Sequence, residues 1–259
     1  MSRLMALQWL AAAALCSAVV GLYAGSHAPQ SAANPARTTA SAHAAPPAPP
    51  GRVPGAIVLF SGKPEELRNN WTRRSGNQPA AWKIKDGAMV AGGGDIVTRQ
   101  EFQDFLLHVE FKEPYMPNAH GQERGNSGVG LHSRYEIQIL DSYGIADPGS
   151  GDCGAVYGQA APLSNACKPP LQWQSYDIAF RASRFDAAGK VVENPRVTVF
   201  QNGIPVQNNQ EIKGMTGIQL SQYREMAKTG PILLQDHGMP VEFRSVWVLP
   251  LPPHGALHY

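Results

Sequence analysis

Helical patterns, clusters of like charge and cysteines are all scarce in this sequence, and each scarcity narrows what the chain can be. The 259 residues include 22 Lys and Arg against 20 Asp and Glu, for a net charge of +2, and these charges form no basic block. Nucleic-acid binding leaves a basic patch as its electrostatic footprint, so we expect no nucleic-acid partner. Helical spacing of apolar residues is nearly absent, and residues 64–69 could make one helical turn.

Familiar catalytic motifs and internal repeats are also missing. No segment matches a phosphate-binding loop, a Gly-x-Ser-x-Gly nucleophile elbow or a His-Glu-x-x-His zinc helix. A Ser-His-Asp triad stays open by composition, although nothing marks a nucleophilic serine. The lack of a fixed repeat disfavours a β-propeller.

What the N-terminus does contain is one long apolar run. Arg3 precedes residues 4–24, which are apolar except for Gln8 and Ser17, and small residues follow. This pattern predicts that residues 1–28 form an export signal. The signal is either cleaved or kept as an anchor, because about 20 apolar residues suffice to cross a bilayer. We therefore expect a periplasmic or secreted protein, which an uncleaved signal would tether to the membrane.

The composition changes sharply after the apolar run. Residues 29–55 are rich in Ala, Pro, Ser and Thr and hold almost no large apolar side chains. Such a segment cannot bury enough surface to offset its ordering entropy, so it is predicted to be a disordered linker. Residues 56–252 then form one folded domain, since roughly 200 residues suffice for a single core, and residues 253–259 form a tail.

Three cysteines are present, and Cys16 lies inside the predicted signal. Leu15 stands where lipidation of Cys16 would require a small residue, which disfavours a lipoprotein. Cys153 and Cys167 remain, and in an exported domain a disulfide between them would persist. We predict this disulfide, which would close a loop of about 15 residues and stabilise the fold by about 3 kcal/mol. Two thiols at this spacing supply too few ligands for a metal site.

The predicted domain consists of short strand-like segments separated by Gly, Pro and Asn. Residues 105–112 alternate between apolar and polar side chains, and Asn202-Gly203 is a strong hairpin signal. This pattern predicts an all-β fold, an antiparallel β-sandwich or jelly roll. The segments expected to be strands are residues 56–60, 105–112, 129–131, 135–140, 173–180, 197–200, 204–206, 232–234 and 241–249.

One segment, residues 125–144, carries an unusual density of polar side chains. Ile137 and Ile139 alternate with Glu136 and Gln138, so we expect the isoleucines in the core and the polar pair on the opposite face of the sheet. In many jelly rolls that face is the concave sugar-binding surface. An ordinary solvated strand face is the alternative. The crowding of further polar residues favours a functional site: Asn126, His132, Arg134, Asp141 and Tyr143.

Two more polar groups follow apolar strands or the cysteine loop. Gln235, Asp236 and His237 precede a glycine at a predicted strand end, where loop residues often carry chemistry. The alternative is a turn in which Asp236 only binds the backbone. Gln159 belongs to the group Tyr157-Gly158-Gln159 beside the predicted disulfide.

Aromatic side chains divide between the core and the surface. Trp173 and Trp247 each lie in an alternating strand, which assigns them to the core or its rim. Trp82 and Tyr143 remain candidates for stacking against a sugar ring.

Six segments together resemble a known family. They are LFSGKPEELRNNW (residues 59–71), GNSGVGLHSRYEIQILDSYG (125–144), GAVYGQ (154–159), WQSYDIAFRASRFD (173–186), VTVFQNGIPVQNN (197–209) and GPILLQDHGMPVEFRSVWVLPL (230–251). In this order they resemble the 3-keto-disaccharide hydrolase domain family over essentially the whole domain. The resemblance implies a concanavalin A-like jelly roll and a small carbohydrate as substrate.

The same fold occurs in retaining laminarinase-type enzymes, which carry Glu-x-Asp-x-x-Glu on one strand. This chain has Glu136, Gln138 and Asp141 at that spacing. A retaining mechanism needs two carboxyl groups about 5–5.5 Å apart. Because Gln138 replaces the middle carboxylate and Asp141 is one carbon shorter than Glu, ordinary laminarinase activity is not expected.

The resemblance implies cleavage of 3-keto-glycosides, by elimination followed by hydration or by direct hydrolysis. A ketone at C3 acidifies the C2 hydrogen, so the reaction needs a base near C2, a stabiliser for the enolate and an acid for the leaving oxygen. Glu136 or His237 is the expected base, and Asp141 or Asp236 the expected acid or orienting group. Arg134, His132 or a bound divalent metal ion would stabilise the enolate.

The expected substrate contacts are Asn126, His132, Arg134, Gln138, Tyr143, Gln159 and Gln235. An oxidoreductase that makes the 3-keto sugar would be a functional partner. A non-catalytic carbohydrate-binding module stays the alternative, because the same fold serves lectins and fold alone does not decide function.

Overall fold

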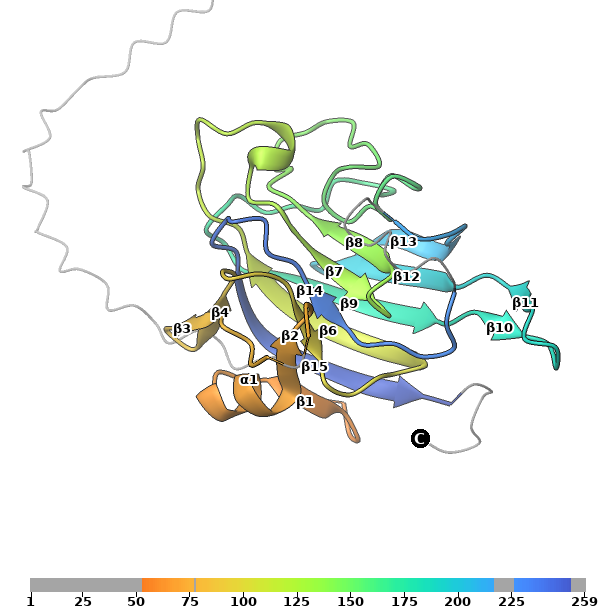
Figure 1. Ribbon diagram of the computed structural model, residues 1–259. Coiled ribbons are helices and arrows are strands. Elements are labelled where there is room, and N and C mark those ends of the chain that lie inside the picture. Colours follow the sequence, from red (N-terminus) through yellow and green to blue (C-terminus); the bar gives the residue numbers. More distant parts are fainter. Residues whose placement is uncertain (1–52, 77, 217–225, 253–259) are drawn as a thin grey trace, which may run out of the picture. The chain divides into compact units, whose positions relative to one another are not determined.

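Two large antiparallel β-sheets, stacked face to face, form the protein in the computed structural model (Figure 1). The structure describes residues 53–76, 78–216 and 226–252. The predicted signal, nearly all of the predicted linker and the predicted tail therefore lie outside the described residues. Within the described part of the chain, no helix is long and apolar enough to span a bilayer.

The larger sheet has eight strands in the order β13–β12–β9–β6–β15–β4–β3, with β1 also paired to β15. Neighbouring strands run antiparallel. The strands are β1 (Ile57–Phe60), β3 (Lys83–Lys85), β4 (Ala88–Val90), β6 (Asp104–Lys112), β9 (Gln174–Arg181), β12 (Arg196–Gln201), β13 (Ile204–Glu211) and β15 (Glu242–Leu251).

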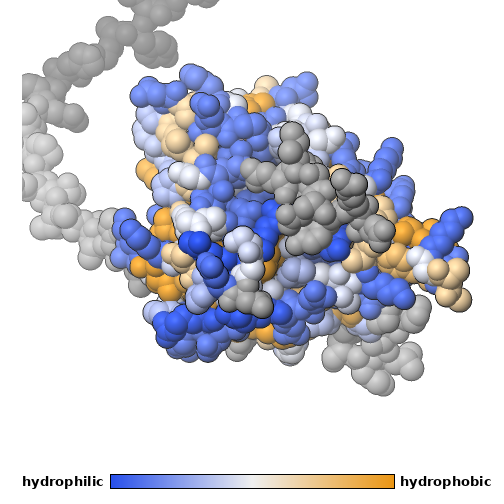
Figure 2. All heavy atoms as spheres, viewed as in Figure 1, coloured by the Kyte–Doolittle hydropathy of each residue, from blue (hydrophilic) through white to orange (hydrophobic). Residues whose placement is uncertain are grey.

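The smaller sheet has five strands in the order β2–β5–β14–β7–β8. They are β2 (Trp71–Arg73), β5 (Ile96–Thr98), β14 (Leu233–Leu234), β7 (Ser127–Leu131) and β8 (Tyr135–Ile139). Outside the sandwich are a helix, a 3-10 turn and a two-stranded hairpin: α1 (Pro64–Asn70), η1 (Gly121–Glu123), β10 (Arg184–Phe185) and β11 (Val191–Glu193). Hydrophobic residues gather on the surface around this hairpin, where Val192 is exposed (Figure 2).

The core lies between the two sheets because each strand turns alternate side chains inward. On β6, Phe105 and Leu107 are fully buried, and on β8 Ile137 and Ile139 are fully buried. Each such side chain stabilises the fold by about 1.5–3 kcal/mol. Rings from both sheets meet in this layer, and the centroids of Tyr135 and Phe180 are 5.9 Å apart. The inward face of β8 is therefore fixed, and so is its opposite face.

The predicted all-β antiparallel sandwich is confirmed, and each predicted strand corresponds to an observed one. The helical turn expected near residues 64–69 is α1. Sequence patterns missed six short strands, since two or three residues give no readable alternation: β2, β3, β4, β5, β10 and β11. A clear hairpin signal was overlooked at Asp86-Gly87. These two residues join β3 to β4, with φ of 50° and 76°. Two-residue Asp-Gly loops are as diagnostic of hairpins as the Asn202-Gly203 turn between β12 and β13.

The prediction of a disulfide is wrong, because Cys153 and Cys167 are both free thiols. The two side chains still share a neighbourhood. The amide nitrogen of Gln201 lies 3.5 Å from the Cys153 sulfur and 3.3 Å from the Cys167 sulfur. The Cys153 sulfur is also 3.0 Å from the Tyr176 hydroxyl. The sequence spacing thus identified neighbours, but hydrogen bonds and not a covalent bond hold them.

Candidate active site

The candidate site lies on the outer face of the five-stranded sheet, the face turned away from the core. In the pairing of β7 with β8, Gly130 is opposite Glu136 and Gly128 is opposite Gln138. Paired residues project to the same side of a sheet, so two glycines adjoin two polar side chains there. Ile137 and Ile139 belong to the hydrophobic core, as predicted, so Glu136 and Gln138 project to the opposite face of β8.

Gly128 is what allows the side chains from β8 and from the end of β14 to meet. A Cβ at Gly128 would lie 2.5 Å from the Gln235 side-chain oxygen and 3.0 Å from a Glu136 carboxyl oxygen. The distance to Gln235 is shorter than real Cβ contacts, so a side chain at position 128 would force the Gln235 side chain to shift from its place over this strand. The backbone N–H of Gln235 donates to the Gly128 carbonyl at 3.1 Å, which fixes the crossing.

The Glu136 carboxyl is the most perturbed acid on this face. Its residue is only 5% exposed. Burial raises its pKa from 4.5 to about 7, polar contact with the Gln235 amide opposes that rise, and the negative charge of Asp95 adds to it. A carboxyl with such a pKa exists in both protonation states near neutral pH, as proton-transfer groups in active sites do.

His237 joins the same group through Gln235. Its Nε2 atom lies 3.1 Å from the Gln235 side-chain oxygen, which can only accept, so this nitrogen carries the proton. Burial lowers the pKa of His237, although Asp95 and Asp236 act in the opposite direction. The ring is therefore neutral at pH 7. Glu136, Gln235 and His237 thus form one polar group that sequence analysis had divided between two segments.

Asp95 and Arg74 complete this end of the face, and sequence analysis missed both. Asp95 directly precedes β5, and its carboxylate accepts from Arg74 at 3.0 Å and from the backbone N–H of Asp236 at 2.9 Å. A pocket of about 230 Å³ lies here, lined by Arg73, Arg74, Ser75, Gly93, Gly94 and Asp95. No local motif marks these residues, because only the pairing of β5 with β14 brings them to the site.

Asp236 binds backbone groups in a turn, which was the alternative to a catalytic role. One carboxylate oxygen accepts from the Gly238 N–H at 2.8 Å, and the other accepts from the Gly94 N–H at 2.7 Å. Both partners are backbone groups, as in an Asx turn. Asp236 therefore ties the loop after β14 to the loop before β5, and its predicted role as an acid is not supported.

Buried amides extend the face along β8. The Gln138 amide nitrogen donates to the Gln122 side-chain oxygen at 2.9 Å, and Asn126 donates to the Gln122 carbonyl at 2.9 Å. The Asn126 side-chain oxygen is buried without a hydrogen-bond partner in the described part of the chain. Gln122 of η1, which sequence analysis missed, connects Gln138 with Asn126.

Asp141 belongs to a different network from Glu136. It follows the end of β8, and its two carboxylate oxygens accept from Arg124 at 2.9 and 3.0 Å. Glu136, Gln138 and Asp141 therefore do not form a row of catalytic groups on one strand. Tyr143, 50% exposed, lies beside this ion pair.

His132 was expected to contact the substrate, but it lies in the core. It is fully buried, its ring centroid lies 4.8 Å from that of Phe180, and its Nε2 lies 2.9 Å from the Gln103 carbonyl. Burial lowers the pKa of His132 to about 4, so it is a neutral core histidine. The alternation fails here because His132 and Ser133 have φ of 55° and 51°, which resets the phase at the hairpin.

The remaining predicted contacts also have structural partners. Arg134 donates to the His132 carbonyl at 2.9 Å, and Gln159 donates to the Gly214 carbonyl at 2.8 Å. Trp82 is buried against Phe243, with ring centroids 5.5 Å apart, so it cannot stack on a sugar.

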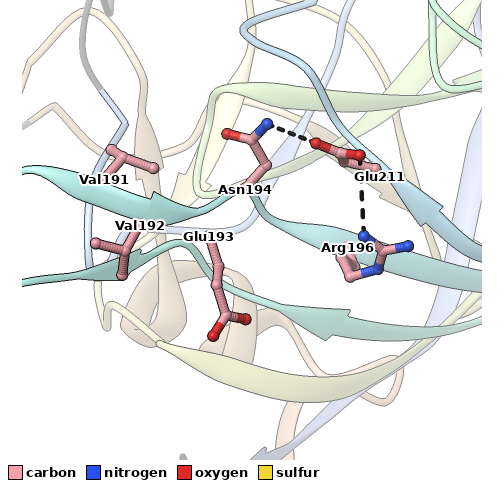
Figure 3. A pocket seen from close by; sticks show the side chains of 6 residues that line it. All are labelled: Val191, Val192, Glu193, Asn194, Arg196 and Glu211. Atoms are coloured by element: carbon pink, nitrogen blue, oxygen red, sulfur yellow. Dashed lines mark hydrogen bonds and ion pairs between the residues drawn. The ribbon is translucent and has the colours of Figure 1, made fainter.

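Two further observations concern metal binding and a second hollow in the protein. Among the described residues, no group of three or more His, Cys, Asp and Glu side chains is placed to hold a metal ion. A hollow of about 400 Å³ beside β11 holds none of the predicted residues (Figure 3). Its wall includes the ion pair of Arg196 with Glu211 at 3.9 Å.

Comparison with known proteins adds a family. Residues 55–249 match the 3-keto-alpha-glucoside-1,2-lyase-like domain family. A candidate glycosyl hydrolase from Parabacteroides distasonis ATCC 8503 is 38% identical with a TM-score of 0.68, over 76% of this chain and 84% of that chain. A second from the same organism is 21% identical with a TM-score of 0.56, over 76% and 94%, and this likeness shows the fold alone. No curated protein matches the chain.

Proposed function

Because the chain belongs to the 3-keto-alpha-glucoside-1,2-lyase-like domain family, a group of glycosyl hydrolase-like, carbohydrate-active proteins, we propose that it cleaves the glycosidic bond of 3-keto-glycosides. The reaction takes place on the outer face of the five-stranded sheet, in an exported protein. The observation that carries the proposal is the buried Glu136 carboxyl, which shares the Gln235 amide with His237 above a strand that has glycine at its outward positions.

The chemistry needs proton transfer but no carboxylate nucleophile. A base removes the proton from C2, and the electron pair forms an enolate with the C3 ketone. The enolate then expels the aglycone from C1, and the departing oxygen takes a proton. Water adds to C1 of the resulting enone and C2 regains a proton, so the net change is hydrolysis. Each step moves one proton at neutral pH, a task for general acids and bases.

Glu136 suits the base because burial has already raised its pKa to about 7. As a carboxylate it accepts the C2 proton, and as a neutral acid it returns a proton to the leaving oxygen or to C2. His237, neutral at pH 7, is the second proton-transfer group. No step is assigned to Asp236, whose carboxylate is bound to backbone N–H groups, and none is routed through a metal ion.

The substrate also defines a partner reaction. Glycosides do not normally carry a ketone at C3, so an oxidoreductase that oxidises the C3 hydroxyl must supply the substrate. The enzyme would then act downstream of that oxidation in the same compartment.

The test uses the full chain with a 3-keto-glucoside and its unoxidised parent, and follows release of the aglycone. Release from the keto form alone is expected. Glu136→Gln should reduce kcat/KM by about 10²–10⁴, the usual contribution of a general base. The matched control is Glu242→Gln, which removes a carboxylate paired with Lys112 on the other sheet and should keep the rate.

The pH profile gives a second readout. If the Glu136 carboxylate is the base, kcat/KM of the wild-type protein should rise with pH through an apparent pKa near 7. Full activity of a variant lacking both Glu136 and His237 would refute the assignment. Sugar binding without any release from either substrate would favour the carbohydrate-binding module instead.

A further inference from the structure

A separate pocket lies beyond the C-terminal end of β8, and no step of the proposed reaction uses it. Its volume is about 480 Å³. Tyr115 and Tyr143, which are 63% and 50% exposed, contribute to its wall. The full lining consists of Tyr115, Met116, Pro117, Ala119, His120, Arg124, Asp141, Tyr143, Pro169 and Pro170.

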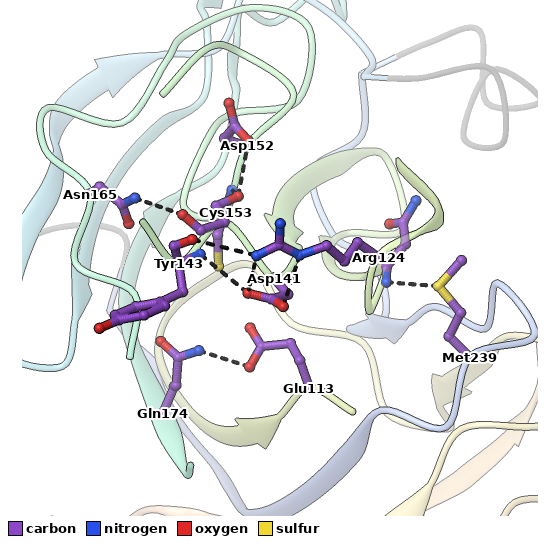
Figure 4. Close-up of polar contacts among 11 residues, drawn as sticks. Glu113, Arg124, Asp141, Tyr143, Asp152, Cys153, Asn165, Gln174 and Met239 are labelled. Carbon is purple, nitrogen blue, oxygen red and sulfur yellow. Dashed lines mark hydrogen bonds and ion pairs between the residues drawn. The ribbon is translucent and has the colours of Figure 1, made fainter. Parts of the chain in front are cut away.

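The polar part of this pocket is a preorganised ion pair. Asp141 has a side chain only 4% exposed, and it accepts two hydrogen bonds from Arg124 and one from the Tyr143 N–H at 3.2 Å. The bonds of Arg124 use Nε and Nη2, and Nη1 is turned away from Asp141 (Figure 4). Bidentate pairing holds the guanidinium in one orientation.

Below the ion pair lies a buried acid. Glu113 is fully buried, one of its oxygens accepts from the Gln174 amide at 2.7 Å, and the other has no hydrogen-bond partner among the described residues. Burial raises the pKa of Glu113 to about 8, and Asp141 contributes to the rise. With Glu113 neutral, Asp141 is the only acidic residue that contributes a negative charge to the pocket lining.

The pocket and the candidate active site are neighbours along β8 and η1. Asp141 lies five positions after Glu136, so their Cα atoms are at most about 17 Å apart even if the chain is fully extended. The turn η1 links the two places, because Gln122 binds Gln138 and Arg124, two residues later, lines the pocket. The two places are therefore close enough in the chain for an elongated ligand to be considered.

We propose that this pocket is a second sugar subsite, which binds a ring of the substrate other than the oxidised ring. Exposed aromatic rings and prolines offer flat apolar surfaces for the apolar face of a pyranose, and tyrosine adds a polar edge. Arg124 and Asp141 offer a donor and an acceptor to neighbouring hydroxyls, as few but well-placed polar groups do in ligand sites. With this subsite the protein would prefer 3-keto-oligosaccharides to 3-keto-glycosides with a small aglycone, an inference that rests on the proposed function.

The kinetic test compares a 3-keto-trisaccharide with a 3-keto-glucoside that has a small aglycone. The measured quantity is KM for the trisaccharide divided by KM for the glucoside. This ratio should rise about tenfold, the loss expected for one aromatic contact, in each of the variants Tyr143→Ala, Tyr115→Ala and Arg124→Lys. The matched control is Phe200→Ala, which removes an aromatic ring 40% exposed on β12 and should leave the ratio unchanged. An equal effect on both substrates, or none, would overturn the subsite.

A binding test separates this inference from the proposed function. Calorimetry measures the affinity of the full chain for the unoxidised trisaccharide, which cannot eliminate. If no 3-keto substrate is cleaved but Tyr143→Ala weakens trisaccharide binding about tenfold and Phe200→Ala does not, the proposed function fails and the subsite stands. If cleavage occurs and the wild-type protein and Tyr143→Ala bind the trisaccharide equally, the reverse holds.

Discussion

Replacement of the proposed base should make the protein more stable, and the size of that gain follows from its burial. In the folded protein the pKa of Glu136 is about 7, against an ordinary value of 4.5. A pKa difference of one corresponds to about 1.4 kcal/mol, so folding with an ionised Glu136 costs about 3 kcal/mol. Glu136→Gln removes that cost while keeping the size of the side chain.

The sign of the effect depends on pH. Because the folded state binds the proton more tightly, the stability that Glu136 contributes is present below pH 4.5 and is lost as pH rises through about 7. The gain from Glu136→Gln should therefore be near zero at pH 4.5 and reach about 3 kcal/mol at pH 8. For a domain of this size, that corresponds to a rise in Tm of about 6–12 °C.

Urea denaturation of the full-length wild-type and Glu136→Gln proteins at several pH values measures this difference. Glu113 also titrates anomalously, but it is present in both proteins and its effect cancels. The control is Glu110→Gln, whose expected sign is opposite. Burial alone would raise the pKa of Glu110, but hydrogen bonds from His108 and Arg244 outweigh it and lower the pKa. Glu110→Gln should therefore destabilise the protein at pH 8, and this loss should shrink as the pH falls.

A Glu136→Gln protein that is equally or less stable than the wild type at pH 8 would refute the reasoning. It would mean that the carboxyl is solvated or charge-compensated in solution. The premise of a base held at a raised pKa would then fall with it.

Two further predictions follow from the geometry. Gly128→Ala should reduce the rate of cleavage, because its Cβ would lie 2.5 Å from the Gln235 oxygen and displace that side chain. Gly92→Ala, whose Cβ would meet nothing within 4 Å, should leave the rate unchanged. Equal rates for both variants would contradict the steric argument. Cys167 should react first with a thiol reagent, because hydrogen bonding from Cys153 lowers its pKa and Cys153 itself is buried. Peptide mass spectrometry after brief labelling checks this order, and modification of Cys153 first would reverse it.

Residue patterns predicted the long strands well because alternation is readable over many positions. Residues 105–112 gave β6 almost to the residue, and the alternation around Ile137 gave the correct faces of β8. The same rule failed at His132, where two left-handed residues shift the phase. Asp95 and Arg74 could not be predicted, because their proximity to Glu136 is created by strand pairing between segments about 140 residues apart in sequence, as in the Asp236–Asp95 bond.

The assembly of the outer face has a consequence for finding the natural sugar. Glu136, Gln235 and Asp95 come from three strands or strand ends that meet only when the sheet is complete. A sugar that contacts all three recognises the folded chain and has no comparable site on the unfolded one. Ligand at 100 times its Kd should therefore raise the free energy of unfolding by about 2.7 kcal/mol. Thermal-shift screening of oxidised and unoxidised sugars could thus identify the ligand independently of the aglycone-release assay.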